Sequence, residues 1–125
     1  PSGKTHDIKF DEQAYVLGIS VNREFDSNVL RFGYSSMVTP QSTYDYNLET
    51  RERKLMKQQE VLGGYDASKY TVERTFATSP DGAKVPITIA YKKGFVKDGK
   101  APLLLYGYGA YAIPMDPGFS STRLS

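Results

Sequence analysis

The residues best suited to chemistry form one short motif, Tyr-Gly-Tyr-Gly-Ala-Tyr at 106–111. It follows an apolar run, 101–105, and ligands of open α/β sheets bind at the carboxyl ends of such strands. Glycines allow the backbone to turn sharply and a ligand to approach closely. The hydroxyl of Tyr108 could therefore donate a hydrogen bond to a developing negative charge, as in an oxyanion hole. A glycine-rich turn with aromatic packing explains the same residues.

The sequence contains no complete set of catalytic residues. It has no cysteine, which excludes thiol nucleophiles, disulfides and thiolate zinc sites. A Gly-x-Ser-x-Gly turn, which would carry a catalytic serine, is also missing. The single histidine, His6, is next to Asp7, and adjacent side chains do not normally face each other. The acidic residues show no metal-ligand spacing, so we expect neither a metal nor a cofactor.

Two further features lie close to the motif. The glycine spacing at 107–112 fits a loose dinucleotide fingerprint, but that fingerprint needs a helix to begin at once. Pro114 and Pro117 follow instead, so we reject a dinucleotide site. Asp116 is the carboxylate placed to meet a ligand at the same strand end, and an exposed loop carboxylate is the competing explanation.

Charge and hydropathy exclude two classes of partner. Sixteen basic and fourteen acidic residues give a net charge of +2, and the two signs are interspersed. Nucleic-acid binding usually needs a clustered basic patch, and the densest basic stretch, 51–57, contains Glu52. No run of 18 apolar residues could span a membrane. The polar N-terminus is unlike a signal peptide and cysteine is absent, so we expect the cytoplasm. These counts do not predict an oligomeric state.

The first half of the chain alternates with period two, which is typical of strands. Four strands are predicted, over 14–21, 29–36, 42–48 and 53–59. Short strands with tight polar turns form a meander, which is also the unit of a propeller blade. A single blade needs neighbours to bury its faces, so a whole propeller is not present. Residues 51–59, which include the last of these strands, also have a weak helical pattern; otherwise helix content should be low.

The second half has a different pattern after a connector at 60–68, the best candidate for a domain boundary. A hairpin is predicted from 70–78 and 84–91, because Pro80 and Gly82 favour a turn between them. Residues 101–109 begin with an unbroken apolar run, which is typical of a strand buried on both faces. We therefore expect the opening of an α/β domain, followed by a loop from 110.

Several segments of the sequence resemble a known family. Residues 31–40, Arg-Phe-Gly-Tyr-Ser-Ser-Met-Val-Thr-Pro, are similar to a blade segment of the prolyl oligopeptidase family, and 105–111 resemble its oxyanion-side motif. Segments similar to the oligopeptidase B branch are 57–61, 65–67 and 119–125.

The resemblance implies a mainly β chain that joins two partial domains. Family members have a seven-bladed β-propeller that caps an α/β-hydrolase domain. Residues 1–62 would supply the last blade strands of the propeller, and 63–125 the first strands of the hydrolase sheet. The chain begins without Met and stops at Ser125, so we expect a segment of a longer protein.

The resemblance also implies an activity, namely hydrolysis of short peptides after Lys or Arg through an acyl-serine. Tyr108 would take the oxyanion-hole role and Tyr111 would line the substrate pocket. Asp116 matches the first of two aspartates that receive basic residues of the substrate, and Gly118 stands in place of the second. The catalytic Ser, Asp and His would lie beyond Ser125. The chain alone should therefore be inactive, with the rest of the protein and basic peptides as its partners.

A different function class remains open from the residues themselves. A self-contained, non-enzymatic, β-rich binding module with an aromatic groove would explain the ten tyrosines and the missing catalytic groups. It would not explain the apolar run at 103–105, which needs partners on both faces.

Overall fold

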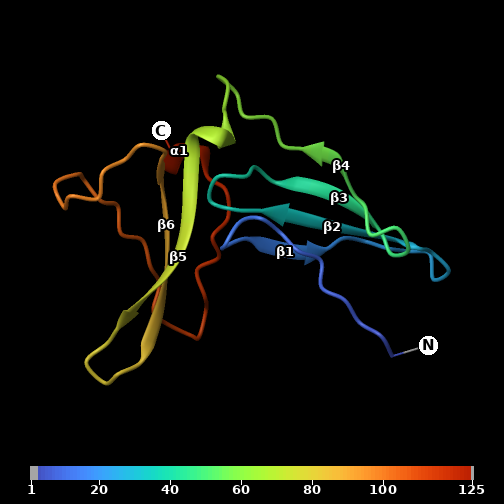
Figure 1. Ribbon diagram of the computed structural model, residues 1–125, viewed down its shortest axis with the longest axis horizontal. Coiled ribbons are helices and arrows are strands. Elements are labelled where there is room, and N and C mark those ends of the chain that lie inside the picture. Colours follow the sequence, from blue (N-terminus) through green and yellow to red (C-terminus); the bar gives the residue numbers. More distant parts are fainter. Residues whose placement is uncertain (1–2, 125) are drawn as a thin grey trace.

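The computed structural model describes residues 3–124, which form a mainly β structure (Figure 1). Its elements are β1 (Val16–Ile19), β2 (Val29–Ser35), β3 (Ser42–Asn47), β4 (Arg53–Gln58), the 3-10 helix η1 (Ala67–Lys69), β5 (Tyr70–Thr78), β6 (Lys84–Lys92) and α1 (Ser121–Leu124). All six predicted strands that precede residue 100 are confirmed, with ends that shift by at most two residues.

Strands β1 to β4 form one antiparallel sheet in chain order, which confirms the predicted meander. The helical alternative for 51–59 is wrong, because β4 occupies 53–58 and pairs with β3. In that pairing Lys54 lies opposite Asp45, and opposite charges on directly facing strand positions attract each other. The register shifts between Thr43 and Tyr44, a β-bulge. Every residue of β4 is exposed, and this strand forms one free edge of the sheet.

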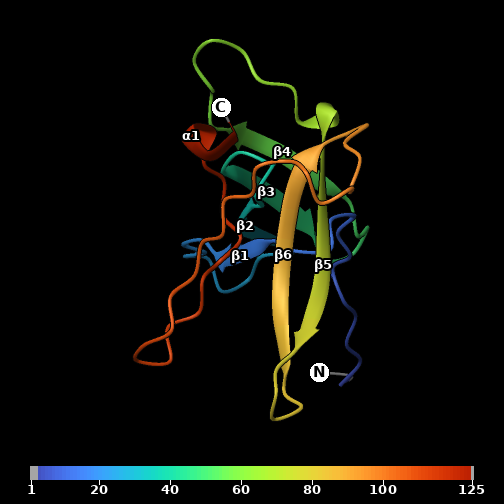
Figure 2. The same ribbon diagram turned by 90° about the vertical axis from the view of Figure 1, so that its left-hand side faces the viewer.

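Strands β5 and β6 form a separate hairpin that stands across one end of the four-stranded sheet (Figures 1 and 2). The two strands pair over their full length, from Tyr70 opposite Lys92 to Thr78 opposite Lys84. The amide of Gly82 donates to the carbonyl of Ser79 at 2.9 Å and closes the predicted turn. Gly82 has φ of 87°, a conformation that favours glycine.

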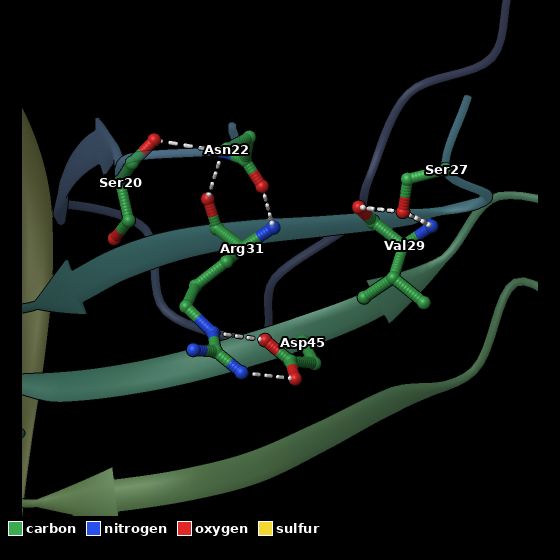
Figure 3. Close-up of polar contacts among 6 residues, drawn as sticks. All are labelled: Ser20, Asn22, Ser27, Val29, Arg31 and Asp45. Carbon is green, nitrogen blue, oxygen red and sulfur yellow. Dashed lines mark hydrogen bonds and ion pairs between the residues drawn. The ribbon is translucent and has the colours of Figure 1, made fainter. Parts of the chain in front are cut away.

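Side-chain hydrogen bonds fix the register of the first three strands (Figure 3). Arg31 on β2 donates two N–H groups to the carboxylate of Asp45, its partner on β3, at 2.6 and 2.7 Å. This hydrogen bond lowers the pKa of Asp45. The Asn22 amide accepts from the backbone N–H of Arg31 at 2.8 Å and donates to the carbonyls of Arg31 and Ser20. The loop between β1 and β2 is thereby fastened to β2.

The core of the sheet is aromatic. Phe32, Tyr34 and Tyr46 are buried, and Phe10 from the N-terminal segment stacks on Tyr34 with ring centroids 4.9 Å apart. The guanidinium carbon of Arg53 lies 4.8 Å from the centroid of the Phe10 ring, a cation–π arrangement. Residues 3–15, which have no regular secondary structure, are held on the sheet by these contacts.

The strand predicted at 101–109 does not form, so this prediction is wrong. Leu103, Leu104 and Leu105 are 80%, 73% and 84% exposed rather than buried on both faces. A two-sided strand forms only beside pairing strands and covering layers, and none accompanies this run within residues 3–124. The described residues include no helix long and apolar enough to cross a membrane.

Candidate active-site segment

The three residues proposed for a site lie on one exposed segment between β6 and α1. Tyr108 is 52% exposed and Tyr111 is 87% exposed, and Asp116 is exposed as well. Within residues 3–124 their hydroxyl and carboxylate groups make no hydrogen bond or ion pair, and no ring contact joins the two tyrosines. The segment therefore presents a hydroxyl donor and a carboxylate to a neighbour or a ligand without bringing them together.

Tyr111 sits at the tip of a tight turn. The amide of Ile113 donates to the carbonyl of Ala110 at 3.2 Å, and the residues between them, Tyr111 and Ala112, have φ of 55° and 53°. Consecutive left-handed residues are characteristic of a type I′ turn, where Gly, Asn and Asp are favoured. A bulky aromatic residue in this conformation is a backbone outlier, and such strain is concentrated at functional positions.

The segment has contacts at Tyr106 and again after Asp116. The guanidinium carbon of Arg123 lies 4.8 Å from the ring centroid of Tyr106. After Asp116, residues 117–120 are partly buried. The ring of Phe119 packs edge-on against Tyr65, with centroids 5.2 Å apart.

A cleft of about 490 Å³ lies between the four-stranded sheet and the start of the hairpin. Its walls include Phe10, Glu12, Tyr34, Arg53 and Tyr70, so they combine aromatic faces with both signs of charge. The cleft marks the junction between the two β structures, and none of the three proposed site residues lines it.

Glu12 organises one wall of this junction. Its carboxylate accepts hydrogen bonds from the hydroxyls of Tyr34, Ser36 (2.6 Å) and Thr39 (3.0 Å). Tyr34 is 5% exposed and Ser36 is fully buried. Burial, together with the hydrogen bond to Glu12, raises the pKa of Tyr34, which therefore stays a donor at neutral pH. The loop between β2 and β3 is thus fixed to the N-terminal segment.

Other candidate groups have structural contacts. Nε2 of His6 lies 3.1 Å from the hydroxyl of Tyr46, and the two rings pack at 5.9 Å, so the histidine takes part in the sheet's packing. No group of three or more His, Asp or Glu residues within 3–124 could hold a metal ion. The described residues therefore offer parts of a site, a donor and a carboxylate, without a nucleophile and a base in contact.

Sequence reasoning missed contacts between segments that lie far apart in the chain. Glu12 meets Ser36 across 24 positions of sequence, and Tyr65 meets Phe119 across 54. Neither pair has a local pattern, since both depend on how separate segments fold back on one another. The one available signal was Tyr65, an aromatic residue within the glycine-containing connector at 60–68.

Comparisons with known proteins match both halves of the chain. Residues 2–59 match the family described as prolyl oligopeptidase, N-terminal beta-propeller domain. The chain is 49% identical over 124 residues to a dipeptidyl aminopeptidase BI of Pseudoxanthomonas mexicana, and 38% identical over 122 residues to a protease 2 of Moraxella lacunata. Each alignment covers 98% of this chain, which spans 17% and 18% of the two relatives.

Solved structures give the same result. Oligopeptidase B from Trypanosoma brucei superposes with a TM-score of 0.78 at 39% identity, over 94% of this chain and 17% of that one. Oligopeptidase B from Leishmania major gives 0.77 at 36% identity, over 94% and 16%. The family match, the curated relatives and the solved structures agree with one another. The chain therefore belongs to the prolyl oligopeptidase family and is similar to its oligopeptidase B members.

Proposed function

We propose that this chain is part of a longer serine oligopeptidase, referred to below as the intact protein, that hydrolyses short peptides after Lys or Arg. In this reaction a serine hydroxyl outside the chain attacks the peptide carbonyl, the scissile C–N bond breaks, and the amine product leaves with the proton given up by the serine. Water then hydrolyses the acyl-serine, which releases the acid product and restores the serine. Tyr108 donates its hydroxyl proton in a hydrogen bond to the oxyanion of the tetrahedral intermediate. Oligopeptidase B from Trypanosoma brucei was solved with covalently bound antipain, which supports a covalent intermediate.

One observation carries this proposal. The alignments to two named peptidases cover 98% of the chain, whereas the propeller match ends at residue 59. The similarity therefore continues through the connector, the hairpin and the segment of Tyr108. A chain related to these peptidases only through a generic propeller blade would lack that continuation.

The proposed architecture follows the same division. Residues 1–62 supply the last blade strands of a seven-bladed propeller, and 63–125 open an α/β-hydrolase domain. Two apolar surfaces support this: the sheet face of the exposed Leu17 and Ile19 with the partly buried Leu30, and the exposed run at 103–105. Surfaces of this kind need covering layers. A self-contained binding module leaves both without explanation.

The proposal is tested by comparing the intact protein with the 125-residue chain. A peptide that carries Lys or Arg before a fluorogenic leaving group should be cleaved by the intact protein only. A fluorophosphonate probe, which reacts with activated serines, should label the intact protein and leave the chain unlabelled. Cleavage by the purified chain, or an intact protein that resists labelling, would contradict the proposal.

A second activity needs its own test because the 49% identical relative is named a dipeptidyl aminopeptidase. Such an enzyme releases dipeptides from a free amino terminus. The same basic reporter with a free and with a blocked amino terminus separates the two activities. Equal cleavage of both forms supports the oligopeptidase, and strict dependence on a free amino terminus supports dipeptide release.

Gly118 offers a gain-of-function prediction. An Asp at this position would restore the pair of carboxylates, two residues apart, that the family resemblance associates with basic substrates. A Cβ at Gly118 would lie 3.8 Å from Oγ of Ser35, an ordinary contact, and the φ of Gly118 is outside the left-handed region. In the intact protein, Gly118→Asp should raise kcat/KM for a basic over a norleucine peptide about tenfold, as expected for one charge-assisted hydrogen bond.

Gly118→Asn is the matched control, because it adds a side chain of the same size without the charge. It should leave the ratio of kcat/KM between basic and norleucine peptides within about twofold, well below the effect of a charged hydrogen bond. Equal ratios for the Asp and Asn variants would show that position 118 does not face the basic residue of the substrate.

A further inference from the structure

Tyr65 in the connector touches three separate parts of the molecule. Its hydroxyl donates to the carbonyl of Val38, in the loop between β2 and β3, at 2.5 Å. Its ring stacks on Tyr70, the first residue of β5, with centroids 5.6 Å apart. The edge-on contact with Phe119 completes the set. A single side chain thus joins the four-stranded sheet, the hairpin and the far end of the candidate-site segment.

The sheet side of this contact is held firmly. Val38 is buried, and its amide donates to Oγ of Ser36 at 3.1 Å. Ser36 in turn donates to Glu12. The carbonyl that accepts from Tyr65 therefore belongs to a loop held on several sides. Burial raises the pKa of Tyr65 to about 12, so its hydroxyl remains protonated and able to donate across the neutral range.

The site side of the contact has fewer restraints. Residues 101–116 are exposed throughout, and partial burial begins at Pro117. Phe119 lies three residues after Asp116, and the Gly118 amide donates to the carbonyl of Asp116 at 2.8 Å. Three residues span at most about 11 Å even when extended, so holding the ring of Phe119 restricts where the Asp116 carboxylate can lie.

We propose that Tyr65 is a positioning residue for substrate recognition: it ties Asp116, through Phe119, to the loop between β2 and β3. The inference rests on the proposed function, in which Asp116 receives a basic residue of the substrate. Tyr65 itself does not touch the substrate. Loss of its ring would let Asp116 move away from the basic residue and weaken ground-state and transition-state binding alike, which raises KM and leaves kcat nearly unchanged.

Kinetics of the intact protein test this inference. Tyr65→Leu should raise KM for a basic peptide about tenfold, within the range by which residues that act at a distance change binding. The norleucine peptide should show no such change. Tyr65→Phe keeps both ring contacts and loses only the hydroxyl bond, so it should recover most of the affinity. Tyr91→Phe, which removes a hydroxyl bonded to Glu73 on the hairpin, should behave as the wild type.

A double-variant comparison separates positioning from general damage. Once Asp116→Asn has removed the carboxylate, Tyr65→Leu should cause no further loss of basic preference. If Tyr65→Leu lowers that preference equally in both backgrounds, or lowers kcat for both peptides, the residue does not act through Asp116 and the inference is wrong.

Hydrogen exchange gives a readout that needs no substrate. Amides of residues 118–123 should exchange faster in Tyr65→Leu than in Tyr91→Phe. Unchanged exchange there overturns the anchoring role whatever the substrate preference. A wild-type protein that shows no preference for basic peptides overturns the specificity in the proposed function instead, and the exchange result still decides whether Tyr65 holds this segment.

Discussion

Replacing Tyr108 by Phe in the intact protein should lower kcat by about 100- to 1,000-fold and change KM far less, because the proposed role of Tyr108 makes its hydroxyl an oxyanion donor. The hydroxyl is the only group removed, and the oxyanion exists only after attack on the carbonyl. An interaction made in the transition state alone lowers kcat rather than raising KM. Within residues 3–124 the hydroxyl of Tyr108 makes no hydrogen bond, so its removal breaks no internal contact. Steady-state kinetics with the basic reporter measure the effect.

Tyr106→Phe is the matched control for this experiment, since it deletes the same atom two residues away. The ring of Tyr106 would remain beside Arg123, whose guanidinium carbon lies 4.8 Å from its centroid. We expect wild-type kcat for this variant. A Tyr108→Phe enzyme whose kcat matches that of Tyr106→Phe would remove Tyr108 from the oxyanion hole.

Glu12→Ala should destabilise the four-stranded sheet locally by about 3 kcal/mol, because buried hydroxyls lose their acceptor. Tyr34 and Ser36 both donate to this carboxylate, and both residues are buried. Global unfolding of a protein with several domains need not be two-state. Native-state hydrogen exchange of amides in β2 and β3 measures the local free energy of opening instead.

Two further variants serve as controls for Glu12→Ala. Glu12→Gln keeps one acceptor oxygen, so we expect a smaller loss. Glu60→Ala removes an exposed carboxylate from the connector and should change the free energy of opening by no more than about 0.5 kcal/mol. Unchanged protection of β2 and β3 in Glu12→Ala would mean that the hydroxyls find other partners.

Local pattern was sufficient to predict the strands. Alternation in 70–78 and the turn around Gly82 predicted β5 with its observed ends, because strand pairing within a hairpin depends on nearby residues. The stretch 51–59 was ambiguous between helix and strand on its local pattern alone. Its strand conformation depends on β3, where Asp45 faces Lys54. Pairing across the sheet decided what the local pattern could not.

The features that local pattern did not predict depend on groups that are far apart in sequence or absent from the described residues. The run at 101–109 has the composition of a buried strand, yet nothing within 3–124 pairs with it. The roles of Tyr108, Tyr111 and Asp116 stay predictions for the same reason, since the groups they would face are not among these residues. The contacts of Glu12 and Tyr65 join residues far apart in sequence, so local pattern does not predict which partners they have.

The exposed edge strand β4 has a consequence for the protein's behaviour in concentrated solution. An unpaired edge is a template for another strand, and apolar edges lead to aggregation. Leu55 and Met56 are nearly half exposed on β4. Lys54 and Lys57 flank them and Arg53 begins the strand, so two copies brought edge to edge would place like charges together. Like charges along β4 therefore oppose pairing of this edge with the same edge of a second copy.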